Sequence, residues 1–279
     1  MLSTTGRRDP PPFARGGSGA RGGSGFSALS LVASYLEEFG GMVRLGSSTL
    51  LQAIRPPYER RLWLDQVFHL GFRSLTITNV TLLFTGMVLA IQTAYSLAAY
   101  GGKSFVGDIV ALSVVRELGP VLTALMVAGR VGAGITAEIG SMTVTEQVDA
   151  LRALASDPVR KLVVPRVVAL VFALPLLTIL ADTVALFGGM VMGVLEVGQT
   201  RAYYLTHTLK ALTVQDIGSG IGKTVFFAFF IGIIACHNGL RARGGADGVG
   251  KATTNTVVVS SIAVIVSDFF LTKLFLVLL

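Results

Sequence analysis

The sequence predicts an all-α integral membrane protein with an interfacial amphipathic helix near its N-terminus and five transmembrane helices. Of its 279 residues, 52% are hydrophobic and only 14% are charged, whereas an ordinary soluble domain is about 25% charged. The mean hydropathy of +0.70 points the same way. Since one helix needs ~20 apolar residues to cross the hydrocarbon core, the apolar stretches leave no room for a second soluble domain.

Residues 1–25 are expected to form a disordered tail, because they consist mainly of Gly, Arg, Pro and Ser and offer little to bury. The pair Arg7-Arg8 is not followed by an apolar segment, so a signal peptide is not expected.

Residues 26–55 are expected to form an amphipathic helix on the membrane surface. Apolar residues recur there at alternating spacings of three and four, at Leu29, Val32, Leu36, Phe39 and Val43. Pro56-Pro57 ends the pattern. The neighbouring residues Arg55, Arg60, Arg61 and Trp63 are typical of a membrane interface.

Five apolar stretches follow, at residues 74–100, 106–137, 167–195, 214–238 and 252–279. Lys and Arg outside these stretches fix their predicted orientation. Sixteen precede the first stretch or lie in the second and fourth connections, against three in the first and third connections. The positive-inside rule therefore predicts a cytoplasmic N-terminus and an external C-terminus.

Several other functions are disfavoured by composition. The net charge of +7 comes from basic residues near the ends of apolar stretches, where they suit lipid headgroups rather than nucleic acid. Cys236 is the only cysteine, and His69, His207 and His237 lie far apart. We therefore expect no disulfide within the chain, no metal site and no catalytic residue.

Charged residues inside the apolar stretches indicate a polar region within the membrane. Arg116, Glu117, Asp182, Lys223 and Asp268 fall at similar predicted depth, where each charge costs ~2.5–3.5 kcal/mol on insertion scales. They could form an ion-pair network that ties the bundle together, or a polar cavity for a headgroup or an ion. The sequence favours neither, and the two are compatible.

Glycines in the apolar stretches imitate nucleotide-binding motifs. Gly218-Ser-Gly-Ile-Gly-Lys-Thr224 resembles a P-loop, but Ile217 stands where the motif needs Gly. Gly189-x-x-x-Gly193 and Gly218-x-x-x-Gly222 instead have the spacing at which membrane helices pack closely. If the protein uses ATP, another chain must hydrolyse it.

The second connection is expected to form a structured cytoplasmic knob. Thr143-x-x-Glu146 matches a capping box that would open a short helix over residues 145–154. Ser156-Asp157-Pro158 would end that helix and start another. A structured loop is the plain interpretation, and a docking element for a partner is the better supported one.

The chain resembles the MlaE/YrbE permease family over residues 26–275, and residues 26–279 are read as its domain. The resemblance rests on Arg116-Glu-Leu-Gly-Pro120, Ala128-Gly-Arg130, Thr136-Ala-Glu-Ile-Gly140, Thr145-Glu-Gln147, Asp157-Pro158, Pro165-Arg166, Lys251-Ala-Thr-Thr254, Ser260-Ser261 and Asp268-Phe269.

The resemblance implies a permease subunit of an ABC transporter in the bacterial inner membrane, which moves lipid to or from the outer envelope. It implies a dimer around a lipid cavity, a cytoplasmic ATPase that holds ATP and magnesium, and an external ring of MCE-domain proteins. No cofactor is expected in this chain. Implied substrate-binding positions are Leu89, Leu97, Tyr100, Arg116, Glu117, Lys223 and Asp268. Implied ATPase-coupling positions are Thr145, Glu146, Gln147, Asp149 and Arg152.

The main alternative is an ion-coupled secondary transporter, with Arg116, Glu117, Lys223 and Asp268 as its relay. Such transporters usually contain inverted repeats, but five spans do not divide into equal halves and no repeat is visible.

Overall fold

The computed structural model describes residues 24–54 and 60–278. Residues 1–23 of the predicted tail, and Pro56-Pro57, lie outside this range. The chain divides into two units, residues 1–40 and 41–279. In the first unit, the described residues form the beginning of helix α1 (Ser24–Ile54), which starts inside the predicted tail and exposes Leu36 and Phe39.

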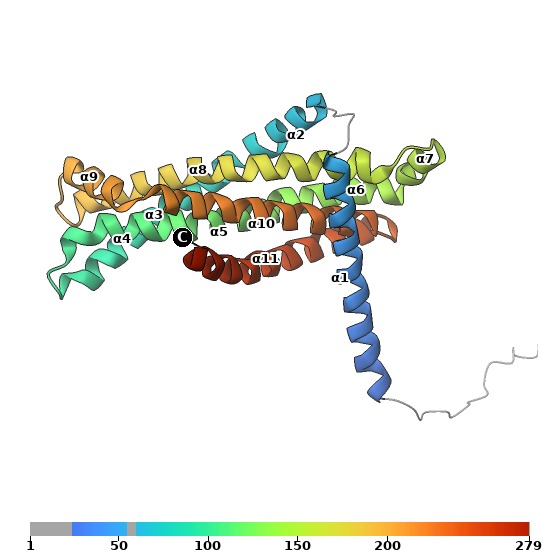
Figure 1. The fold of residues 1–279 in the computed structure, drawn as a ribbon, viewed down its shortest axis with the longest axis horizontal. Coiled ribbons are helices and arrows are strands. Elements are labelled where there is room, and N and C mark those ends of the chain that lie inside the picture. The colour runs from blue at the N-terminus through green and yellow to red at the C-terminus, as the bar shows by residue number, and fades with distance from the viewer. Residues whose placement is uncertain (1–23, 55–59, 279) are drawn as a thin grey trace, which may run out of the picture. The chain divides into compact units, whose positions relative to one another are not determined.

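The described part of the second unit is helical (Figure 1). After α1 it contains α2 (Arg60–Phe72), α3 (Leu75–Ala98), η1 (Lys103–Phe105), α4 (Val106–Ser113), η2 (Val114–Leu118), α5 (Gly119–Val127), η3 (Ala128–Gly132) and α6 (Ala133–Val144). It continues with α7 (Gln147–Ala153), η4 (Val159–Val163), α8 (Val164–Leu195), α9 (Arg201–Ala211), α10 (Val214–Leu240) and α11 (Gly245–Leu278).

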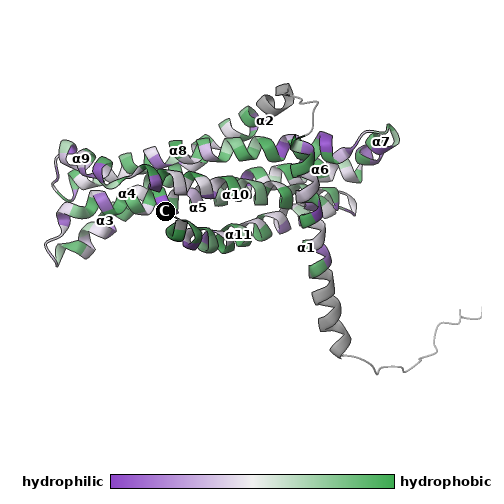
Figure 2. Cartoon of the chain, in the orientation of Figure 1, coloured by the Kyte–Doolittle hydropathy of each residue, from purple (hydrophilic) through white to green (hydrophobic). Residues whose placement is uncertain are grey.

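The prediction of five spans is confirmed. Five helical stretches in the described residues are long and apolar enough to cross a membrane, at Gln66–Ala98, Lys103–Val144, Val159–Leu195, Val214–Leu240 and Gly245–Val277. Green, hydrophobic residues run along α8, α10 and α11 in Figure 2. The second stretch is one continuous rod made of η1, α4, η2, α5, η3 and α6, in which η2 and η3 are π-helical.

The helices extend about two turns beyond the second and third predicted apolar stretches. Helix continues to Val144 in one and starts at Val159 in the other. Buried Arg166 of α8 forms a 2.8 Å ion pair with Glu138 of α6. This pair accommodates two charged side chains where the helices continue past the fall in hydropathy.

Glycines let α3 and α8 approach at backbone distance. A Cβ at Gly86 would collide with the Ala185 carbonyl, and one at Gly188 with the Leu83 carbonyl. One apolar cluster, among α3, α4 and α8, surrounds these contacts, and a second lies among α5, α6, α8, α10 and α11.

The predicted close packing is found at three of the four glycines. Gly189 and Gly193 make room for the side chain of Tyr204 in α9, and Gly189 also lies against Val110 of α4 and the backbone of Gly86 in α3. Burial of that phenol raises the pKa of Tyr204 to about 12, so it stays neutral near pH 7. Gly218 meets nothing within 4 Å, whereas Gly222 faces the Phe275 ring.

Candidate functional site

The site begins with an irregularity in the second span. In the π-helical segment η2, the amide of Gly119 donates to the carbonyl of Val114, five residues back. An α-helix would direct that amide to Val115. The next residue is Pro120, which has no N–H to offer to Arg116. The carbonyls of Val115 and Arg116 therefore both lose their usual donors inside an apolar bundle, where such groups need a substitute.

Helix α10 contacts both carbonyls. The Arg116 carbonyl accepts a hydrogen bond from Nζ of Lys223 at 3.1 Å. The Val115 carbonyl lies so close to Gly220 that a Cβ there would collide with it. One turn of α10 thus places the Lys223 ammonium at the Arg116 carbonyl and the side-chain-free Gly220 at the Val115 carbonyl.

The ammonium of Lys223 is buried in oxygen atoms from two other helical stretches. Its side chain is 2% exposed. Nζ lies 2.6 Å from Oε2 of Glu117, 2.6 Å from Oγ1 of Thr272 and 3.1 Å from Oδ1 of Asp268. Since an ammonium has three N–H donors, Lys223 is fully occupied within the protein.

A second ion pair lies beside the first. Nε of Arg116 donates to Oδ1 of Asp216 at 2.6 Å. The other carboxylate oxygen of Asp216 accepts from the amide and hydroxyl of Thr213, each at 2.8 Å. Thr213 and Asp216 form a capping box at the start of α10, which holds the Asp216 carboxylate in place for Arg116.

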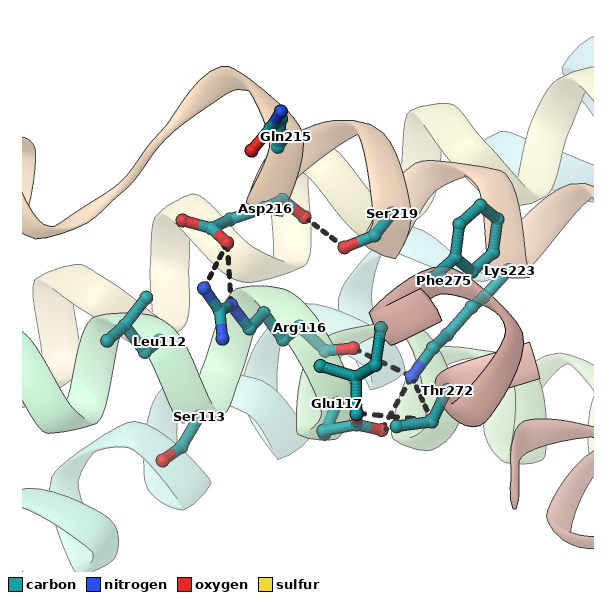
Figure 3. A pocket seen from close by; sticks show the side chains of 11 residues that line it. Leu112, Ser113, Arg116, Glu117, Gln215, Asp216, Ser219, Lys223, Thr272 and Phe275 are labelled. Atoms are coloured by element: carbon teal, nitrogen blue, oxygen red, sulfur yellow. Dashed lines mark hydrogen bonds and ion pairs between the residues drawn. The ribbon is translucent and has the colours of Figure 1, made fainter. Parts of the chain in front are cut away.

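The two ion pairs border a cavity of about 450 Å³ (Figure 3). In that view, Arg116 points toward Asp216, and the Lys223 ammonium lies between Glu117 and Thr272. The lining residues come from α4, η2, α10 and α11, and they are Leu112, Ser113, Arg116, Glu117, Gln215, Asp216, Ser219, Lys223, Thr272, Phe275 and Leu276. Arg116 and Glu117 are the charged side chains most open to it, at 46% and 40% exposure.

The structure brings four of the predicted substrate-binding residues together. Arg116, Glu117 and Lys223 line the cavity, and Asp268 contacts Lys223. Leu89 and Leu97 of α3 pack instead against the cluster of α3, α4 and α8, and Tyr100 is 86% exposed. None of these three lines the cavity within a single chain.

Of the five charges expected at similar depth, Asp182 does not join the ion pairs. Asp182 of α8 packs against Gly119, and one of its carboxyl oxygens is buried without a hydrogen bond to any described residue. The partner of Arg116 is Asp216, and a partner of Lys223 is Thr272; neither residue is among the predicted site residues. The spacing Thr213-x-x-Asp216 is itself a capping-box pattern and could have indicated Asp216.

The predicted capping box at the knob is not formed. The hydroxyl of Thr143 donates to the Ile139 carbonyl within α6. Glu146 is the N-cap of α7, with φ of 62° and no side-chain cap hydrogen bond. Helix α7 is therefore shorter than the predicted helix over residues 145–154.

Side-chain contacts nevertheless connect the residues of the knob. Gln147 donates to the Thr145 hydroxyl at 3.1 Å, and Arg152 pairs with Asp149 at 2.8 Å. Beyond α7, Asp157 caps the turn at Val159 and accepts a hydrogen bond from Gln52 of α1 at 2.8 Å. The helix that begins at Pro158 leads directly into α8 and is not a separate short helix.

Known proteins resemble this chain over most of its length. The family described as "Permease MlaE" matches residues 63–274. A probable ABC transporter permease protein of Rickettsia conorii is 41% identical over 241 residues, covering 86% of this chain and 93% of that protein. A probable ABC transporter permease protein of Synechocystis is 40% identical over 230 residues, covering 82% and 88%. The chloroplastic protein TRIGALACTOSYLDIACYLGLYCEROL 1 of Arabidopsis thaliana is 35% identical over 231 residues, covering 83% and 66%.

The family expected from the sequence is thus confirmed, and with it the non-catalytic role of the chain. Permease subunits of ABC transporters contain the path through the membrane and leave ATP hydrolysis to another subunit. The match includes the five apolar helical stretches except the last residues of α11. The chain belongs to the MlaE permease family and is a multi-pass membrane permease subunit of an ABC transporter.

Proposed function

We propose that this permease moves phospholipid or a related lipid between the bacterial inner membrane and the outer envelope, and thereby serves outer-membrane lipid asymmetry. A separate ATPase subunit would bind ATP and magnesium and drive the cycle. The family assignment supports the ABC mechanism. The name of the Arabidopsis relative, which is that of a glycerolipid, supports a lipid substrate.

The cavity is the observation that carries this proposal. It combines exposed ends of Arg116 and Glu117 with apolar side chains of Leu112, Phe275 and Leu276. A polar and an apolar lining side by side suit an amphiphile, whose head pairs with the charges while its tails stay out of water. A simple ion needs no such apolar wall.

A second copy of the chain would complete the site. The cavity has the size of a small-molecule pocket, and the tails of a two-chain lipid need additional apolar wall. Helix α11 exposes Ile262, Val266 and Phe269, and a facing copy would extend the wall. In such a dimer, Leu89 and Leu97 of α3, and Tyr100 just after it, keep their proposed place along the lipid path.

The distribution of basic residues supports one orientation of the chain in the membrane. It puts the N-terminus and α7 in the cytoplasm and α9 outside. In this orientation α7, with Thr145, Glu146, Gln147, Asp149 and Arg152, would dock on the ATPase as the coupling helix. A ring of MCE-domain proteins would meet the opposite end. Membrane lipids would be the remaining partner, and nucleic acid would have no role.

Reconstitution with the cognate ATPase subunit tests the proposal. We expect ATP-dependent transfer of fluorescent phospholipid between donor and acceptor vesicles, and no transfer when the ATPase is inactivated by mutation. Transfer driven by a proton or sodium gradient without ATP would instead favour the ion-coupled alternative. Absence of lipid transfer in every condition, with an active ATPase, would refute a lipid substrate.

A further inference from the structure

The charges around the cavity do not balance. Three carboxylates, those of Glu117, Asp216 and Asp268, meet only two cations, Arg116 and Lys223. One negative charge therefore remains uncompensated beside the buried Lys223 and Asp216, where charge interactions are stronger than in solvent. A ligand with a net negative charge would add to this excess.

The two cations differ in what they can offer a ligand. Lys223 is 2% exposed, and its donors are used by protein oxygens. Arg116 is 46% exposed and engages Asp216 through Nε and Nη2, which leaves Nη1 outside that pair. An arginine presents five N–H donors in a fixed plane, so the free edge of Arg116 can still hold a phosphate oxygen.

Glu117 supplies the opposite charge on the wall of the same cavity. It follows Arg116 in the chain and is 40% exposed. Further oxygen acceptors line the same cavity on Ser113 and Ser219, and the Ser219 hydroxyl uses its proton on the Asp216 carbonyl. A primary ammonium near Glu117 would thus find several acceptors. A quaternary ammonium prefers an aromatic cage, and Phe275 is the single aromatic residue among the lining residues.

We propose that the cavity selects zwitterionic lipids whose headgroup carries a phosphate diester and a primary ammonium, with the phosphate on Arg116 and the ammonium on Glu117. This inference rests on the proposed function, since it names the lipid class for the same site. A headgroup of this class adds no net charge and complements both exposed side chains. An anionic headgroup would satisfy Arg116 and face the uncompensated carboxylate.

Retention of matched lipids by the permease–ATPase complex tests the selection. The complex is purified from nanodiscs that contain equal phosphatidylethanolamine, phosphatidylglycerol and phosphatidylcholine with identical acyl chains. Lipid retained per complex is then measured by mass spectrometry. We expect phosphatidylethanolamine to exceed each of the others by about threefold, the scale of a partly exposed charge pair. Equal retention of all three lipids, or a preference for phosphatidylglycerol, would overturn the selection.

A positive charge added to the cavity lining gives a sharper test of the headgroup preference. Gln215 lines the cavity, is exposed and belongs to neither ion pair. Gln215→Lys should offset the excess charge and bring the ratio of phosphatidylethanolamine to phosphatidylglycerol down to one or below, while Gln215→Met keeps it. An unchanged ratio in Gln215→Lys contradicts the proposal. If the complex binds and transports lipid without a preference, only the headgroup selection is refuted. If the wild-type complex neither retains nor transports lipid, the proposed function itself is refuted.

Discussion

The ammonium of Lys223 takes the place of a backbone amide at the carbonyl of Arg116, 3.1 Å away. In a regular helix the donor would be the backbone N–H of residue 120, but that residue is Pro120 and has none. A proline inside a helix leaves the carbonyl four residues earlier without its donor, and neighbouring groups must satisfy it when no water is present. The proline in the second span therefore helps to position the lysine of the fourth.

Pro120→Ala should weaken the site without harming the fold. Alanine restores an N–H, so the Arg116 carbonyl can return to the helix and Lys223 loses one acceptor. Because a hydrogen bond from a charged group contributes ~1.5–3 kcal/mol, we expect transport to fall about tenfold or more. Folded yield should be unchanged or higher. Pro175→Ala in α8 is the control, since it lies outside the cluster, and equal transport in both variants would contradict this role.

Gly220→Ala should destabilise the bundle, because the added Cβ would meet the Val115 carbonyl. Gly218, two residues earlier on the same helix, meets nothing within 4 Å, so Gly218→Ala is the matched control. Overpacking of a tight contact costs about 1–3 kcal/mol, and we expect a lower melting temperature for Gly220→Ala alone. Thermal unfolding followed by size-exclusion fluorescence would show it. A normal melting temperature for that variant would mean that α10 can move away from η2.

Lys223→Met should lower folded yield strongly, since it leaves the carboxylates of Glu117 and Asp268 without their cation. Breaking a buried ion pair costs about 3–5 kcal/mol. The triple variant Lys223→Met, Glu117→Gln, Asp268→Asn removes all three charges and should recover much of the yield. It should still fail in lipid transfer if the cluster serves the substrate. Full transport in the triple variant would reduce the cluster to a structural network.

The presence of the site was predictable, but its geometry was not. Charges in apolar stretches are expensive, so Arg116, Glu117, Lys223 and Asp268 stood out in the sequence and do come together. Asp216 was passed over because it lies at the start of a span and looks like an ordinary polar boundary residue. Its pairing with Arg116 depends on the tilt and register of two helices, which periodicity does not specify.

The helix ends at the knob were also not predictable from the sequence pattern alone. Thr143-x-x-Glu146 fits the capping pattern as well as Thr213-x-x-Asp216 does, yet only the second is a capping box. Thr143 lies within α6, whose hydrogen bonds continue to Val144, so its hydroxyl bonds back to Ile139. Contacts between helices favour the continuation of α6, since its Glu138 pairs with Arg166 of α8.

Charge reversal on α7 tests the proposed ATPase contact. Glu146 and Asp149 are exposed on the knob, and the double variant Glu146→Lys, Asp149→Lys should lose copurifying ATPase while the permease stays folded. Asp247→Lys on α11, also exposed, controls for added positive charge. The measurement is the ratio of ATPase to permease after affinity purification. An undiminished ratio, with full lipid-stimulated hydrolysis, would place the docking surface elsewhere.

Labelling of single cysteines tests the orientation on which this coupling role depends. The native Cys236 is buried and would first be replaced by Ala to remove background. Thr206 is exposed on α9, and Asp247 is exposed near the start of α11. In intact spheroplasts, a membrane-impermeant maleimide should modify Thr206→Cys and spare Asp247→Cys, and permeabilisation should expose the second. The reverse pattern would put α7 outside the cell, where a cytoplasmic ATPase could not reach it, and would refute the coupling role together with the orientation.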